Sequence, residues 1–270
     1  MQTRNRHITI FAAPLAAALM AVPALPGLAG INESPQFTTA HAPDPFDPIK
    51  AYGKEIIFDV YRKGARIGSH TVQFNQDDAL LTATSRFDIS IRLLGLPLYA
   101  YSYTSRGSWR RGELIAIEAE TNDDGTKSRV KAGLSDDASG DGMLSVFGPD
   151  SQSLVRVGIY PTTHWNPGVI GANKILNTIT GHTNTVSMSD LGVEAVVTGG
   201  AQRQARHFAY RGELENHVWY DSNGRWVKMR FPGKDGIDIE YRCRKCGEDI
   251  PPHHSETNAG YRQTQGQVLR

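Results

Sequence analysis

The sequence predicts an all-β protein, built as an antiparallel meander of about fourteen strands that curls into an open or half β-barrel, a spiral sheet. Three observations predict this fold. Short segments of alternating apolar and polar residues recur along the chain, turn residues separate them every ~8–12 residues, and no strand–helix–strand alternation appears. A run of sequential hairpins this long is expected to roll up rather than stay flat. The inward faces fit either a filled core or an apolar cavity.

The N-terminus has the layout of a secretory signal peptide over residues 1–29. Basic residues precede a charge-free apolar stretch at 8–22, and prolines and small residues follow. We expect cleavage after Ala24 or Ala29 and therefore a periplasmic protein, with an uncleaved membrane anchor as the alternative. Residues 30–53 hold four prolines among polar residues, which predicts a disordered linker.

The first run of strands begins at Lys54. Ile56, Phe58 and Val60 alternate with more polar residues, the period of two that is typical of a strand. Lys63-Gly64 closes the first hairpin, and similar turns follow each later strand. The predicted strands of this run cover residues 54–61, 67–74, 81–94, 98–109, 114–121, 128–134, 144–147 and 154–157.

The segment Tyr160–Pro167 interrupts the alternation and separates two runs of β-structure. Asn166-Pro167 favours a helix start, which predicts one short helix near residues 166–174. In the second run, Asn223-Gly224 is the strongest hairpin signal. The predicted strands here cover residues 183–188, 194–197, 207–210, 218–220, 226–229 and 237–241, so that the β-domain spans 54–242 and a disordered tail spans 243–270.

Several motifs in the β-domain form an ordered set. They are Phe58–Arg62, Ile67–His70, Leu93–Leu96 before Tyr99–Tyr103, Asn122–Gly125, Thr163–Pro167, Leu176–Gly181, Val218–Asp221 and Gly224–Trp226. The set resembles a bacterial exported family catalogued as domain of unknown function family 6134, over about residues 54–242. The resemblance implies a periplasmic β-protein and no assigned activity. The family is distantly similar to periplasmic open-barrel proteins, some of which carry lipids or lipoproteins.

His164 and Trp165 form the best local candidate for a ligand site. A histidine in an irregular loop can act as a base or bind a polar headgroup, and a tryptophan can close a pocket. The structural alternative is that Trp165 plugs the end of the barrel. Tyr99, Tyr101 and Tyr103 share one strand face and are further ligand candidates, although such rows more often pack against neighbouring strands. The last candidate in the ligand-binding set is Trp219.

Cys243 and Cys246 are spaced as C-x2-C. A local disulfide is the preferred interpretation in an oxidising compartment. A redox pair, or a metal site completed by His253 and His254, are the alternatives, but no helix follows the pair and the histidine spacing differs from that of zinc fingers.

Composition narrows the function. A formal net charge of +1 gives no reason to expect nucleic acid as a partner. No nucleophile elbow, phosphate-binding loop or zinc-protease motif occurs, and no cofactor is predicted. We expect a non-catalytic periplasmic protein that binds an apolar or amphipathic, lipid-like envelope molecule in its curved sheet, with no membrane span after cleavage. The alternatives are an envelope scaffold or protein-interaction module with a filled core, and a hydrolase that uses His164.

Overall fold

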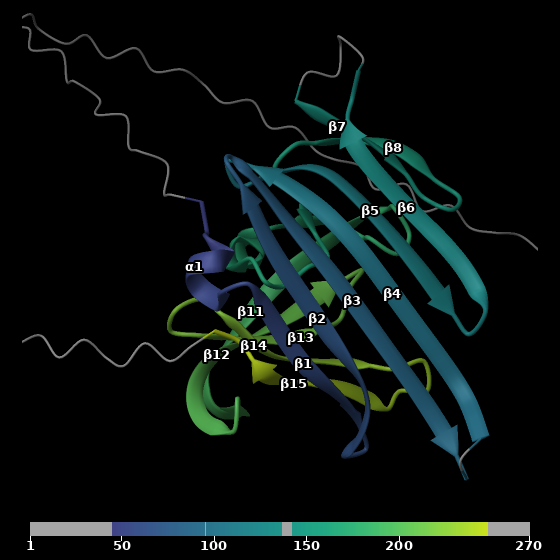
Figure 1. Ribbon diagram of the computed structural model, residues 1–270, viewed down its shortest axis with the longest axis vertical. Helices are drawn as coiled ribbons and strands as arrows, with labels where there is room; N and C mark the ends of the chain where they lie inside the picture. The colour runs from purple at the N-terminus through teal and green to yellow at the C-terminus, as the bar shows by residue number, and fades with distance from the viewer. Residues whose placement is uncertain (1–44, 95, 137–141, 248–270) are drawn as a thin grey trace, which may run out of the picture. The chain divides into compact units, whose positions relative to one another are not determined.

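The computed structural model describes residues 45–94, 96–136 and 142–247 (Figure 1). All of them belong to one compact unit, Asp44–Arg270. The described residues form one α-helix, one 3-10 helix and fifteen strands of a single sheet. The elements of the first half are α1 (Pro48–Tyr52), β1 (Glu55–Arg62), β2 (Ala65–Asp77), β3 (Leu80–Leu93), β4 (Leu96–Arg110), β5 (Glu113–Asp123), β6 (Thr126–Leu134), β7 (Met143–Phe147) and β8 (Gln152–Arg156). Those of the second half are β9 (Tyr160–Pro161), η2 (Pro167–Gly171), β10 (Lys174–Leu176), β11 (Thr183–Thr198), β12 (Ala201–Gly212), β13 (His217–Asp221), β14 (Trp226–Pro232) and β15 (Asp238–Lys245).

The order of the strands explains why the sheet curls. It runs from β8 back to β1, continues with β15, and runs back from β15 to β9. The first and last strands therefore pair at its middle, as Val60 does with Tyr241. Its two edges, β8 and β9, follow each other in the chain. The stretch from Arg156 to Tyr160 spans at most ~14 Å, so the edges must approach each other although the ladder does not close between them. The predicted open barrel is confirmed.

The hairpin turns are those that the sequence indicates. Lys63 and Gly64 have φ of 50° and 78°, and Asp124 and Gly125 have φ of 51° and 97°. Two consecutive left-handed residues are the signature of the turn that matches the twist of paired strands. Glycine at the second position adopts that conformation without a steric penalty.

Alternate residues of each strand face a shared core. Ile56, Phe58 and Val60 are fully buried on β1, as the period of two predicts. Phe58 contacts the ring of Trp226 on β14 at 4.2 Å between centroids. Tyr241 on β15 packs against the same Phe58 at 5.9 Å. Aromatic side chains from distant strands thus meet inside the curve.

The domain extends past both predicted boundaries. Within the segment 30–53, predicted as linker, Asp47 caps α1 by accepting hydrogen bonds from the N–H groups of Ile49 and Lys50, and Tyr52 is buried. At the other end, β15 continues to Lys245, inside the predicted tail. These corrections have one cause: apolar burial and capping at chain ends depend on distant partners, which local composition does not reveal. The predicted signal peptide, most of the linker and the tail from residue 248 lie outside the described residues.

The middle of the chain differs in detail from the prediction. The short helix is present as the 3-10 turn η2, where the side chain of Asn166 accepts from the N–H of Gly168. It stops at Gly171, and Lys174–Leu176 forms strand β10 instead. The predicted strands 183–188 and 194–197 are one strand, β11, because a register shift between Asp190 and Val193 carries the ladder through the interruption. Among the described residues, no helix reaches the length and apolarity that a bilayer span requires.

Candidate functional site

His164 and Trp165 lie inside the curve, in the loop between β9 and η2. The exposed fractions of the two residues are 5% and 2%. The Trp165 ring packs edge-on against Trp109 of β4 and Phe74 of β2, with centroids 5.1 and 5.3 Å apart. This arrangement is the plug that the structural alternative describes.

Two buried tyrosine hydroxyls hold this loop in place. Tyr220 donates to the carbonyl oxygen of His164 at 2.9 Å, and Tyr52 donates to that of Trp165 at 2.9 Å. The Tyr52 oxygen also accepts from the N–H of Trp226 at 2.7 Å. Helix α1, the loop and the β13–β14 hairpin are therefore joined through buried hydrogen bonds, and burial raises the pKa of both hydroxyls.

A second interior histidine, His70 on β2, has no counterpart among the predicted site residues. Its ring lies 5.6 Å from that of Trp226, and the His164 ring lies 5.4 Å from the same indole. Neither ring nitrogen of His70 has a hydrogen-bond partner. Desolvation, with a smaller contribution from His164, lowers the pKa of His70 to about 3, and desolvation lowers that of His164 to about 4. Both imidazoles are thus neutral at neutral pH. A histidine that shares one face of β2 with Val72 and Phe74 is the signal that points to His70.

The three tyrosines follow the inner face of β4 toward its open end. Tyr103 is hydrogen-bonded to Thr178 at 2.7 Å, so the loop after β10 also reaches this face. Burial raises the pKa of Tyr101 to about 12. Tyr99 lies nearest the end of the strand, where its hydroxyl donates to Asp123 at 2.8 Å. The row packs against neighbours and reaches the rim of the sheet only at Tyr99.

Trp219 lies on the other side of the sheet from His164. Its neighbour Tyr220 points inward, so Trp219 faces outward. There it stacks on His207, with ring centroids 4.1 Å apart, and the Lys228 ammonium lies 4.7 Å from its ring. Its indole N–H donates to Glu194 of β11. The structure therefore does not bring the six predicted ligand residues into one site: His164 and Trp165 form the plug, the tyrosines line β4, and Trp219 is buried under side chains of the opposite face, with 2% of its surface exposed.

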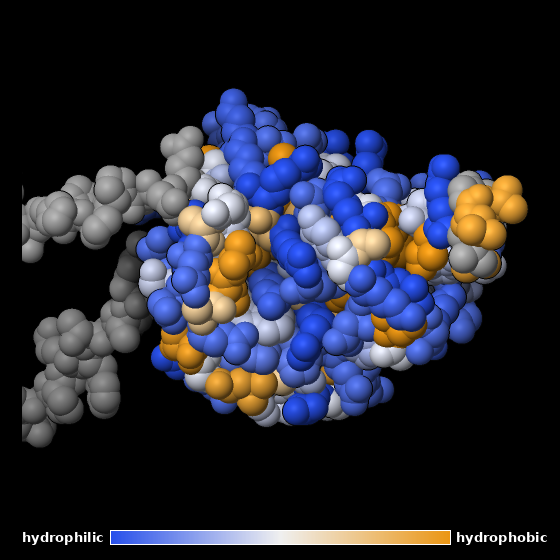
Figure 2. All heavy atoms as spheres, turned by 90° about the horizontal axis from the view of Figure 1, so that it is seen from below, coloured by the Kyte–Doolittle hydropathy of each residue, from blue (hydrophilic) through white to orange (hydrophobic). Residues whose placement is uncertain are grey.

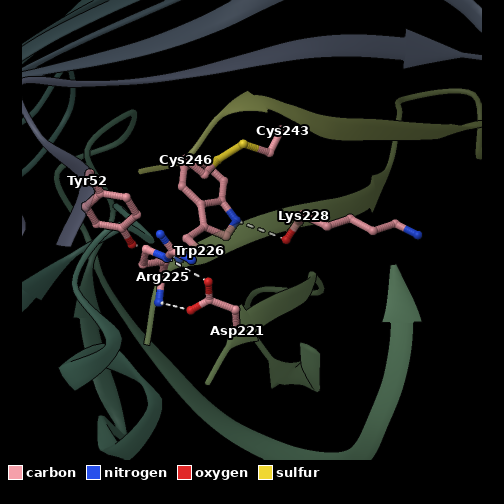
Figure 3. The surroundings of a disulfide bond; sticks show 7 residues. All are labelled: Tyr52, Asp221, Arg225, Trp226, Lys228, Cys243 and Cys246. Atoms are coloured by element: carbon pink, nitrogen blue, oxygen red, sulfur yellow. Dashed lines mark hydrogen bonds and ion pairs between the residues drawn. A yellow bond between two sulfur atoms is a disulfide. The ribbon is translucent and has the colours of Figure 1, made fainter. Parts of the chain in front are cut away.

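Cys243 and Cys246 form a disulfide at the end of β15 (Figure 3). The Trp226 ring lies beside it, and both cysteines are nearly buried. His253 and His254, the other residues of the alternative metal site, lie outside the described residues. Within the described part of the chain, no group of three or more His, Cys, Asp or Glu side chains is arranged to hold a metal ion.

The same region contains a buried ion pair at the β13–β14 turn. Arg225 Nε donates to Asp221 Oδ2 at 2.7 Å, and each side chain is 5% exposed. The other carboxylate oxygen accepts from the backbone N–H groups of Asn223 and Arg225. Through these hydrogen bonds the Asp221 carboxylate stabilises the hairpin turn that Asn223-Gly224 predicts (Figure 3).

A groove of about 410 Å³ lies on the outer face of β2–β5. Its floor is a row of residues in register across four strands: Ser69, Asp88, Ser102 and Asn122. A second groove of about 600 Å³ continues over β4–β6 and shares Ser102 and Asn122 with the first. Hydroxyl, amide, carboxylate and guanidinium groups thus line the first groove together with a few apolar residues such as Ile67 and Ala100. Sequence reasoning missed this feature, since outward polar residues on adjacent strands look like ordinary solvated positions.

The first groove runs toward the β3–β4 hairpin. Ser90 and Ala100, which line it, pair with each other where the hairpin leaves the sheet. Beyond them, Leu94, Leu96 and Leu98 are 96%, 71% and 63% exposed. An amphipathic surface therefore extends from the polar groove to an apolar tip.

Comparison with known proteins gives a family and a fold. The sequence-family model of DUF6134, a domain of unknown function, matches residues 58–244. The chain belongs to the DUF6134 family. No curated protein matches this DUF6134 chain. Among solved structures, it is similar to a crystal structure of a β-barrel-like protein of domain of unknown function DUF1849 from Brucella abortus, with 14% identity and a TM-score of 0.50 over 71% of this chain and 95% of that one. The DUF6134 domain therefore has a β-barrel-like fold.

Proposed function

We propose that this DUF6134 protein is an exported, non-catalytic protein of the cell envelope that binds a lipid-like amphipathic molecule. The observation that carries the proposal is the outer groove that leads to an apolar hairpin tip. A polar headgroup finds hydroxyl, amide and charged partners in the groove, and an apolar chain finds leucines beyond it. The signal-peptide layout of residues 1–29 supports export.

This proposal moves the binding surface from the hollow of the sheet to its outer face. The plug residue Trp165 and its neighbours Phe74 and Trp109 occupy the interior that a guest would need. We place no reaction at His164, because its ring is buried and is held at 3.5 Å from the Tyr210 hydroxyl rather than facing solvent.

Lipid extraction and native mass spectrometry of protein purified from its own envelope test the proposal. We expect a bound amphipathic molecule in the wild type and a several-fold loss in Ser102→Trp, which fills the point where the two grooves meet. Thr84→Trp places the same indole on the outward face of β3, at a position that lines neither groove, and should keep the ligand. Equal ligand content in the three proteins would show that the groove is not the site.

A scaffold function is the second candidate. The filled interior favours it, because a protein that works through its surface needs no cavity. Capture of one defined protein partner by the wild type and by Ser102→Trp alike, with no co-purified lipid, would support the scaffold instead.

A further inference from the structure

The β3–β4 hairpin projects beyond the rest of the sheet. Pairing of β3 with β2 ends at Ile89, and pairing of β4 with β5 ends at Tyr101. From Ser90 to Ala100 the two strands pair with each other and with no other described strand. Five residues of extended chain reach about 15 Å. The backbone of Ala100 is still bonded to Asp124, and beyond it the hairpin forms a two-stranded finger whose outer backbone edges pair with no other described strand.

The tip of this finger is apolar and exposed. Leu94, Leu96 and Leu98 stand in solvent, and Leu94 is almost completely uncovered. Figure 2 shows a hydrophobic patch at the right edge of the molecule, at the position of this turn, and further orange groups near the left and lower edges. Three exposed leucines on a protruding tip form an apolar patch of the kind that marks an interaction surface.

The base of the finger carries a tyrosine and charged side chains of both signs. Arg92 lies two residues before the tip. The Lys234 ammonium lies 5.6 Å from the Tyr99 ring and 2.6 Å from Asp123. Lys63 belongs to the adjacent β1–β2 turn, at the same end of the sheet. Lys234 is already paired with Asp123, so Arg92 and Lys63 are the basic side chains that meet the headgroup layer of an anionic membrane when the tip inserts.

The shape of the finger favours a bilayer over a protein partner. A narrow, convex tip with three leucines covers far less than the ~800 Å² that each side of a standard protein interface buries. A bilayer needs no complementary pocket. The free edges of the hairpin also limit its depth, because unpaired backbone groups are costly in hydrocarbon. Shallow insertion by ~5–10 Å submerges the leucines and leaves Tyr99 and Lys234 at the interface.

We infer that the β3–β4 tip inserts Leu94, Leu96 and Leu98 into the surface of an anionic lipid bilayer. The inference rests on the proposed function and names the source of the amphipathic molecule: a lipid met at the membrane surface. The finger then brings the adjoining groove within reach of the headgroups.

Vesicle sedimentation tests this, using the chain as recovered from its own envelope. The vesicles are phosphatidylethanolamine with or without phosphatidylglycerol. We expect the wild type to bind, Leu94→Ser/Leu96→Ser to bind at least tenfold more weakly, and Arg92→Gln to weaken binding to the phosphatidylglycerol vesicles selectively. Leu191→Ser/Val193→Ser is the matched control, because it removes exposed apolar side chains from β11, and it should bind as the wild type does.

The possible outcomes separate this inference from the proposed function. Equal vesicle binding by the wild type and the tip variant overturns the inference, and so does a change of oligomeric state in the tip variant, which would assign the leucines to a second copy. If lipid is retained in the groove but vesicle binding does not depend on the tip, the proposed function is supported and the inference about the tip is wrong. Vesicle binding that depends on the tip, with no lipid found in the groove, supports membrane insertion of the tip and contradicts lipid binding in the groove.

Discussion

At the residue scale, His70 couples the core to pH. A buried histidine whose pKa is lowered stays neutral in the folded protein, whereas in the unfolded chain it gains a proton below about pH 6.5. The unfolded state then binds more protons, so the free energy of unfolding decreases as pH falls. The loss begins near pH 6.5 and ends near the folded pKa values, about 4 for His164 and about 3 for His70.

We therefore predict that His70→Phe reduces the acid sensitivity of the fold. Each buried histidine contributes a slope of ~1.4 kcal/mol per pH unit within this window, so the variant should lose that part of the slope between pH 6 and 4.5. At pH 7 it should be neutral or stabilising by ~1 kcal/mol, since two unpartnered nitrogens disappear. Urea unfolding at several pH values measures both effects. Val72→Ala, on the same face of β2, should shift stability at every pH without changing the slope.

At the element scale, the plug loop depends on hydrogen bonds that reach it from other elements. We predict that Tyr52→Phe costs ~1–3 kcal/mol, because it leaves the Trp165 carbonyl and the Trp226 N–H without their partner. Tyr220→Phe should cost a similar amount through the His164 carbonyl. The comparison variant is Tyr61→Phe, whose ring lies on the outer face under Arg242 and should cost under ~0.5 kcal/mol. Chemical unfolding measures the free energy of unfolding of the three variants. If Tyr52→Phe lost no more stability than Tyr61→Phe, these hydroxyls would not hold the plug loop.

The elements also show which information the sequence carries. Hairpins such as Lys63-Gly64 and Asn223-Gly224 are local, because turn residues and the period of two specify them within ten residues. The continuity of β11 is not local: Asp190 to Gly192 look like a break, and the partner strand β12 carries the ladder past them. The site behaves in the same way. His164 and Trp165 are unusual residues at an unusual place, but whether they face a guest or a core depends on Phe74, Trp109 and Tyr52, far away in the sequence.

At the scale of the whole molecule, β1 and β15 join the two halves. Strand number and the tendency to curl follow from composition and turn spacing, but this pairing of the first and last strands connects residues that are 177 to 188 positions apart. The pairing has two consequences. It brings the described ends of the chain together, so that the backbone of Gly247 lies against that of Ala51. It also leaves the β8–β9 connection as a seam that no ladder crosses.

The seam makes a topological prediction. In one circular permutant, a short Gly/Ser linker joins Gly247 to Asp47 and the chain is opened at Gly158. This permutant keeps every strand pair of the sheet. We therefore expect the native far-ultraviolet circular dichroism spectrum and cooperative unfolding, with a free energy of unfolding reduced by no more than ~2 kcal/mol. Opening the same joined chain at Gly112 cuts the β4–β5 hairpin, which contributes ten paired positions, and should cost clearly more. Thermal and urea unfolding of both permutants provide the comparison. If opening at Gly158 were the more damaging cut, the short connection would be what holds the curl, and the ladder from β8 through β1 and β15 to β9 would not suffice to form the open barrel.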